Sequence, residues 1–157
     1  MTHDHIVGKK VVSSTFGVGV VVSVEQMAGG NYFYVIESDA LKAKTFVPVS
    51  DDTNFRLLGT KEELEVFLTA LSSPLGEIHH ASKKDRINDY KKRSLDQRLE
   101  PLSKILREMY ELDDLGSSEE RIFEKLLETL TKEVSIVFNL DEENSRDKII
   151  RSLKGEV

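Results

Sequence analysis

The first third of the chain consists of short β-branched and aromatic runs separated by turn-forming residues. The runs lie at residues 11–12, 18–24, 32–36 and 46–49, with a last short one at 54–57. Gly17 and the pair Gly29-Gly30 stand in the intervening turns. Short runs cut by Gly and Asn are typical of hairpin-linked strands. Several of them within about fifty residues predict a small β barrel, which leaves few strand edges exposed.

After residue 58 the β pattern does not return, and apolar residues recur at helical spacing instead. Thr60 and Glu63 form a capping box at the start of the first helix, which a Ser-Ser-Pro-Leu-Gly stretch ends. Further helices are predicted at residues 82–95, 96–115 and 117–137 and around 149–153, with Asp96 as a cap. We therefore predict an α+β chain. Its parts are a β domain over 1–59, a connecting helix and linker over 60–76, and an all-helical domain over 77–157.

The composition of the 157-residue chain excludes several classes of protein. It contains no cysteine, so disulfides and thiolate metal sites are excluded. The first ten residues lack the apolar stretch of a signal peptide, and no apolar run reaches the length of a membrane span. We therefore expect a cytoplasmic protein without membrane contact.

Charge is distributed unevenly along the chain, although the net charge is −6. Residues 79–107 carry 9 Lys/Arg and 4 Asp/Glu, whereas residues 1–78 carry 6 and 10 and residues 108–157 carry 7 and 14. A basic segment between two acidic ones indicates a polyanionic partner, because Lys and Arg neutralise phosphates whatever the base sequence. Helix starts at Ser82 and Asp96 would add N–H donors. The candidate DNA-binding residues are Lys83, Lys84, Arg86, Lys91, Lys92, Arg93 and Arg98. The alternative is an ordinary solvated helix face.

Residues 8–21 resemble the opening motif G-D-x-V-V-Y-P-x-H-G-x-G-x-[IV] of the RNA-polymerase-interacting domain. CarD-like bacterial transcription regulators share this domain with the transcription-repair coupling factor. The matching residues are Gly8, Val11, Val12, Gly17, Gly19 and Val20, then the aromatic strand at 32–36 and the pair Val47-Pro48. In the helical half, residues 115–123 (LGSSEERIF) are similar to the family's L-S-x-x-E-[KR]-x-[ML] helix start. The helicase motifs of the coupling factor are absent, so the stand-alone CarD-like type is the better match.

The resemblance implies an SH3/Tudor-like barrel that binds the β subunit of RNA polymerase by strand pairing. It also implies a helical domain that contacts the backbone of promoter DNA. Arginines with which relatives contact the polymerase correspond here to Met27 and Phe46, which would make the contact more apolar. Strand phase alone leaves open whether Phe46 is exposed or lies in the barrel core.

The chain departs from the family pattern at several positions. Ser13, Ser14 and Phe16 stand where the family has Tyr-Pro and His. Actinobacterial relatives carry a tryptophan that acts as a wedge at the upstream edge of the promoter bubble. Ala81 takes that place here, and the chain has no tryptophan at all. The basic residues are therefore retained without the wedge.

We expect a non-catalytic transcription regulator that modulates the stability of the open promoter complex and needs no cofactor or metal. No Ser/His/Asp or Cys/His arrangement supports an enzyme, and the pair His79-His80 lacks a nearby third ligand. The alternative is a polymerase- or protein-binding adaptor without DNA contact, which the acidic total and the missing tryptophan favour. A monomer and a homodimer paired through the sheet edge both remain open.

Overall fold

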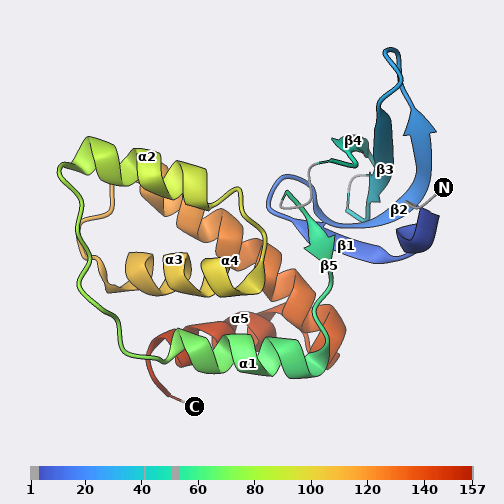
Figure 1. Ribbon diagram of the computed structural model, residues 1–157. Coiled ribbons are helices and arrows are strands. Elements are labelled where there is room, and N and C mark those ends of the chain that lie inside the picture. Colours follow the sequence, from blue (N-terminus) through green and yellow to red (C-terminus); the bar gives the residue numbers. More distant parts are fainter. Residues whose placement is uncertain (1–3, 41, 51–53, 157) are drawn as a thin grey trace.

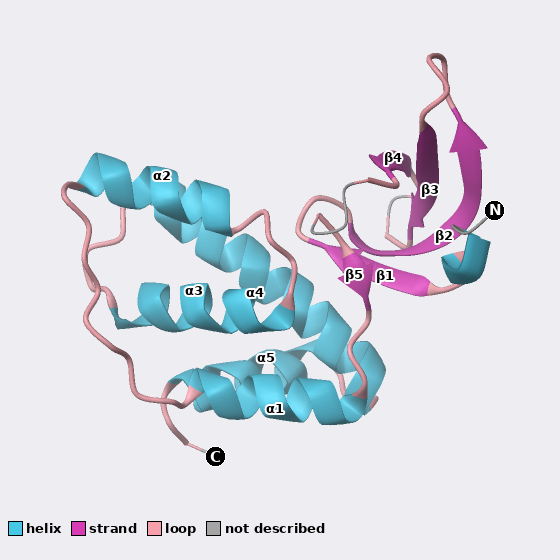
Figure 2. Ribbon diagram, viewed as in Figure 1, coloured by secondary structure: helices cyan, strands magenta, loops and turns pink. Residues whose placement is uncertain are grey.

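The computed structural model describes residues 4–40, 42–50 and 54–156. In these ranges a short 3-10 helix (Asp4–Ile6) is followed by strands and then by helices (Figures 1 and 2). The strands are β1 (Lys10–Ser13), β2 (Gly17–Gln26), β3 (Tyr32–Ser38), β4 (Lys44–Pro48) and β5 (Arg56–Leu57). The helices are α1 (Lys61–Leu71), α2 (Lys83–Arg93), α3 (Leu99–Glu111), α4 (Ser117–Phe138) and α5 (Glu142–Leu153). This content confirms the predicted α+β class. None of the described helices is long and apolar enough to cross a membrane.

The strands form one antiparallel sheet in the order β4-β3-β2-β1-β5. Glycines with left-handed backbone, Gly17 at φ +78° and Gly29 at φ +92°, stand at the β1–β2 and β2–β3 turns. Both turns agree with the sequence prediction. Within the described residues the sheet is not closed, which corrects the expectation that few edges would be exposed. Closure fails because β5 is only two residues long and pairs with β1 alone, at the side of the sheet away from β4.

One face of the sheet carries its apolar core. Its central residues are at most 8% exposed and come from β1, β2, β3 and β4: Val11, Val21, Tyr34, Ile36 and Val47. Ile6 before β1 and Phe55 before β5 complete this core, and the Tyr34 and Phe55 rings pack edge to face at 5.5 Å. The segments that directly precede β1 and β5 are therefore packed against the sheet.

The helices enclose a second apolar core. All five helices contribute to it, with Leu64, Phe67, Leu68, Leu71, Tyr90, Ile105, Leu106, Leu127, Leu130 and Ile149 among its buried residues. Four of these residues belong to α1, which packs against α3 and α5. Helix α1 is therefore a structural part of the helical body. Within the predicted connecting segment at 60–76, residues 61–71 thus form a helix of this body, and the linker is the part after Leu71.

Local polar signals start the helices, though not always where the sequence predicted. At α1 the capping box is confirmed, because the Thr60 hydroxyl accepts the Glu63 N–H at 3.1 Å and the Glu63 carboxylate accepts the Thr60 N–H at 2.9 Å. Helix α3 begins after Arg98, two residues later than predicted. Asp96 accepts the Arg98 N–H at 3.1 Å and so shapes the turn before the helix instead of capping it.

A network of polar groups joins the sheet to the helices. Glu133 of α4 is fully buried, and its carboxylate oxygens accept hydrogen bonds from both terminal nitrogens of Arg56 on β5, each at 2.6 Å, and from the Gly59 N–H at 2.8 Å. Arg56 Nε donates to the Gln97 carbonyl oxygen at 2.6 Å. The Gln97 side chain accepts the Ser14 N–H at 3.2 Å and donates to the Ser14 hydroxyl at 3.0 Å. We call these five residues the interface network.

Glycine at position 59 allows the chain to pass close to this carboxylate. A Cβ atom there would lie 3.2 Å from the Leu64 side chain and 3.5 Å from Glu133 Oε2. The first contact is tighter than ordinary van der Waals packing, so a Cβ atom at this position would require the buried Leu64 side chain to shift by a few tenths of an ångström.

Replacing Glu133 by alanine is expected to lower the free energy of unfolding by about 3–5 kcal/mol, because the Arg56 guanidinium would stay largely buried without its anion. Urea denaturation followed by circular dichroism measures the change. The control is Glu128→Ala on the same helix, where the side chain is 68% exposed and pairs with Lys132 at 3.7 Å. We expect the control to change stability by less than about 0.5 kcal/mol. Equal losses in both variants would contradict a stabilising role for the interface network.

Candidate docking edge and basic helix face

Strand β4 forms an outer edge of the sheet, because only β3 pairs with it among the described residues. The Ser38 N–H donates to the Ala43 carbonyl at 2.9 Å, and the Val49 N–H donates to the Tyr32 carbonyl at 3.1 Å. In an antiparallel pair, the residues whose backbone groups face the partner strand alternate with residues whose groups face away. Positions 45 and 47 therefore face β3, as 43 and 49 do, and positions 44, 46 and 48 face outward.

The outward groups of β4 are the N–H and C=O of Lys44, the N–H and C=O of Phe46, and the C=O of Pro48. Proline has no N–H to offer, so the donor pattern of this edge ends at Phe46. A row of such groups is what an added strand from another chain requires. The edge is short, which limits strand addition to a few residues.

The Phe46 side chain lies on the surface beside this edge. It is 48% exposed and stands opposite Val35 of β3, which is 1% exposed. The side chains of the neighbouring cross-strand pair, Tyr34 and Val47, point to the apolar core on the other face of the sheet. Of the two alternatives left open by the sequence, the structure therefore places Phe46 outside the core.

Met27 is not part of the same surface as Phe46. It is half-buried at the β2–β3 turn, where its N–H donates to the Asn31 carbonyl at 2.8 Å and its carbonyl accepts the Gly30 N–H at 3.0 Å. Along β3, the Asn31 and Val35 rows are four residues apart, which corresponds to about 13 Å. The two predicted polymerase contacts thus lie at separate places on the sheet.

Helix α2 presents lysines on the side that faces away from the protein. Arg86 and Tyr90 are buried, and at 100° per residue Lys84 and Lys91 lie on the opposite side, with Lys92 beside them. All three lysines are exposed. The fourth, Lys83, is also exposed and lies 3.5 Å from the Asp114 carboxylate. We call Lys84, Lys91 and Lys92 the lysine face.

Arg86 has a structural role that its sequence position did not indicate. Its guanidinium donates to both oxygens of Glu119, at 2.7 and 2.8 Å, and to Asp114 Oδ1 at 2.9 Å. The residue is 7% exposed, and Glu119 is 1% exposed. These hydrogen bonds raise the pKa of Arg86, and the bonds that Arg86 donates to Glu119 have the largest effect. Arg86 in turn lowers the pKa of both carboxyl groups. The charge of Arg86 is therefore buried and compensated, which leaves little of it for the phosphate contact that the sequence analysis expects.

The other two predicted arginines also have acidic partners. Arg93 makes two hydrogen bonds to Glu108 of α3, at 2.9 and 2.5 Å, and a third to Asp89 at 3.2 Å. Arg98 pairs with Asp96 at 2.6 Å, although its side chain is 67% exposed. Arg93 therefore serves to attach α2 to α3, and neither arginine offers the uncompensated charge that phosphate binding was expected to use.

The start of α2 offers little to a phosphate. The Ser82 hydroxyl already accepts the Asp85 N–H at 3.1 Å, and the Asp85 carboxylate occupies the first turn. The two histidines nearby are engaged singly, His80 with Asp89 at 2.9 Å and His79 with Glu77 at 3.1 Å. No group of three metal-ligating side chains occurs in the part of the chain that the structure describes.

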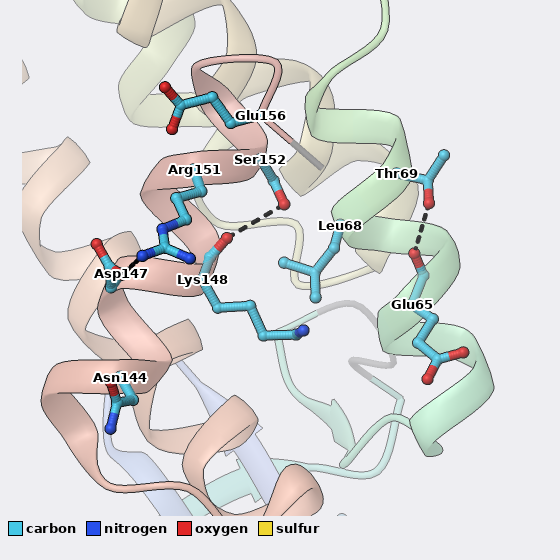
Figure 3. A pocket seen from close by; sticks show the side chains of 9 residues that line it. All are labelled: Glu65, Leu68, Thr69, Asn144, Asp147, Lys148, Arg151, Ser152 and Glu156. Carbon is cyan, nitrogen blue, oxygen red and sulfur yellow. Dashed lines mark hydrogen bonds and ion pairs between the residues drawn. The ribbon is translucent and has the colours of Figure 1, made fainter.

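A hollow of about 470 Å³ lies between α1 and α5 (Figure 3). Its polar groups bond within their own helices. The Thr69 hydroxyl donates to the Glu65 carbonyl at 3.0 Å, and Arg151 pairs with Asp147 at 3.0 Å. Figure 3 shows that these side chains do not converge on a common point, so the hollow lacks the arrangement of an active site.

Glu119 holds helix α2 through Arg86, while Glu133 and Gln97 hold the sheet against the helices. The sequence did not indicate a site role for any of the three. Glu119 lies in the stretch 115–123 that is similar to the family's helix start, but this likeness did not indicate its partners. In the structure Glu119 Oε1 accepts the Gly116 N–H at 3.0 Å at the start of α4. Glu133 and Gln97 carried no signal, since an acid or an amide on a helix is ordinary without knowledge of its partner.

Comparison with known proteins leaves the resemblance to rest on the motifs alone. No family model matches this chain, and no curated protein matches it significantly.

The buried Arg86–Glu119 pair makes stability depend on pH below about 4.5, which is the ordinary pKa of a glutamate side chain. Because the folded-state pKa of Glu119 is lowered, the unfolded chain binds this proton more tightly, so stability present above pH 4.5 is lost as the pH falls. Replacing Glu119 by Gln removes this titration. The variant is expected to be less stable at pH 7 and to lose less stability between about pH 5 and pH 3.

Urea midpoints measured across this pH range test the prediction. The control is Glu120→Gln, an exposed neighbour on the same helix. We expect its stability curve to run parallel to that of the wild type. A Glu119→Gln curve that also runs parallel to the wild type would contradict the assignment.

Proposed function

We propose that this chain is a non-catalytic, cytoplasmic regulator of bacterial transcription of the CarD-like type. Its sheet, of SH3/Tudor-like type, docks on the β subunit of RNA polymerase, and its helices contact the backbone of promoter DNA. The single observation that carries the proposal is the β4 edge, which among the described residues only β3 pairs, with Phe46 exposed beside it. The motif resemblance supplies the identity of the partner.

The edge supports docking by strand addition. Main-chain hydrogen bonds give affinity in this mode, while side chains beside the edge give specificity. Phe46 would contact an apolar residue of the partner strand, and the exposed Lys44 favours an acidic one. An apolar anchor of this kind makes the contact less sensitive to salt than the arginines of the relatives would.

The lysine face supports a limited, sequence-independent contact with DNA. It can neutralise about three phosphates, one for each lysine, through counterion release. If the protein binds the open promoter complex better than the closed one, it shifts that equilibrium by the difference in affinity.

An adaptor that docks on the polymerase without touching DNA is the second candidate. Burial of Arg86 and pairing of Arg93 and Arg98 favour it, because they compensate three of the seven predicted cations. The Asp114 carboxylate beside Lys83 reduces the local charge further.

Replacing Lys44 by proline tests docking at the edge. Proline removes an N–H that faces outward, so the bonds between β4 and β3 should remain. We expect binding to an isolated β-lobe fragment of the polymerase to weaken by about tenfold, the equivalent of one good hydrogen bond. The measurement is fluorescence anisotropy or calorimetry with this fragment.

Two further variants separate the backbone from the side chains. Lys44→Ala removes the side chain alone and should weaken binding less than Lys44→Pro, while Phe46→Ser should weaken it without changing any backbone group. Absence of binding by the wild type, or equal binding by Lys44→Pro, would contradict docking at this edge.

Changing Lys84, Lys91 and Lys92 together to glutamine tests the DNA contact. On a fork-junction promoter fragment, the slope of log affinity against log salt should become shallower by about 2–3. The matched control changes the exposed Lys104, Lys125 and Lys154 to glutamine, with the same loss of charge. If the wild type does not bind at low salt, or both triple variants behave alike, the adaptor reading replaces the DNA-binding one.

A further inference from the structure

The interface network connects the four segments that meet between the sheet and the helices. Ser14 lies in the β1–β2 turn, Arg56 on β5, Gln97 in the α2–α3 loop and Glu133 on α4. Figure 1 shows these segments meeting between the two parts of the molecule. Their bonds are directional, and Glu133 and Gln97 are at most 3% exposed.

Gln97 also holds the end of α2. Its Nε2 donates to the Ser94 carbonyl at 3.0 Å, and Ser94 caps the helix by donating to the Tyr90 carbonyl at 2.9 Å. The turn continues with the Leu95 N–H bonded to the Lys92 carbonyl at 3.2 Å. One amide side chain therefore links the helix that carries the lysine face to the turn that enters the sheet.

The interface network thereby fixes the position of the β4 edge relative to the lysine face. The β4 edge belongs to the sheet, the lysine face belongs to α2, and no part of either surface takes part in the interface network. A change in the network can thus alter the relative placement of the surfaces without altering the groups that bind.

We propose that Gln97 is a positioning residue that sets the angle between the docking edge and the lysine face. Docking on polymerase then delivers the lysines to DNA. This inference rests on the proposed function, because it assumes that both surfaces bind. Two linked contacts strengthen each other only when their geometry allows both at once. Loss of the Gln97 clamp should therefore weaken the coupling between the contacts and leave each single contact intact.

The experiment compares three affinities for the wild type and for Gln97→Ala. The probes are the isolated β-lobe fragment, the fork-junction promoter fragment alone, and polymerase holoenzyme assembled on that promoter. Coupling is the ratio of the affinity for the assembled complex to the affinity for the isolated β-lobe fragment. We expect Gln97→Ala to bind each single probe within about twofold of the wild type and to lose about tenfold in coupling.

Three further variants distinguish a folding defect from a loss of relative position between the two surfaces. Gln26→Ala makes the same substitution on β2, where the side chain donates to the Gly30 carbonyl at 3.1 Å, and should leave coupling unchanged. Ser14→Ala removes one acceptor of Gln97 and should lower coupling in part. Because the chain has no cysteine, Ser14→Cys with Gln97→Cys can be joined specifically by a short bifunctional thiol reagent, which should restore coupling.

Unchanged coupling in Gln97→Ala overturns the inference. The inference is also overturned if Gln97→Ala loses affinity for the single probes and the cross-linked Ser14→Cys, Gln97→Cys variant does not regain it. Gln97 would then be a residue that stabilises the fold in general. A wild-type chain that binds neither single probe overturns the proposed function, and the inference with it. Single-probe binding is measured first, so the two failures are distinguishable.

Discussion

Glu133 is buried without any exposed surface, so its negative charge has to be compensated from within the protein. Arg56 and the Gly59 N–H supply three donors at 2.6–2.8 Å, and each comes from the strand side of the molecule. A buried carboxylate with directional donors tolerates fewer arrangements than an apolar contact of the same size. We infer that this ion pair specifies how the sheet sits on the helices, while the two apolar cores provide most of the folding energy.

On helix α2 the arginines and the lysines have different environments. Arg86 and Arg93 are held in paired hydrogen bonds to carboxylates, for which the planar guanidinium is suited. The lysines stay at the surface, where a compact and strongly hydrated charge costs nothing to expose. The basic segment thus both attaches the helix to the body and charges its outer side. A count of basic residues therefore overstates the charge available to a partner.

Features set by neighbours in sequence were predictable, and features set by distant partners were not. The strand runs, the glycine turns and the Thr60–Glu63 capping box are local, and all are present. Arg86 meets Glu119 across 33 positions and Arg56 meets Glu133 across 77, so nothing near either arginine revealed its role. The exposure of Phe46 was open because alternation defines two faces without saying which is buried. The open sheet follows from the length of β5, which local propensity does not determine.

Under the proposed function, the small number of free lysines determines the order of events. Three phosphate contacts give a weak, salt-sensitive affinity, and the net charge of −6 opposes approach to DNA at long range. Docking at the β4 edge would replace free diffusion by an effective concentration in the millimolar range near the promoter. At that concentration weak contacts suffice, while elsewhere on the chromosome the acidic protein stays unbound. The edge then selects the polymerase, and the lysines act only on the DNA that this polymerase holds.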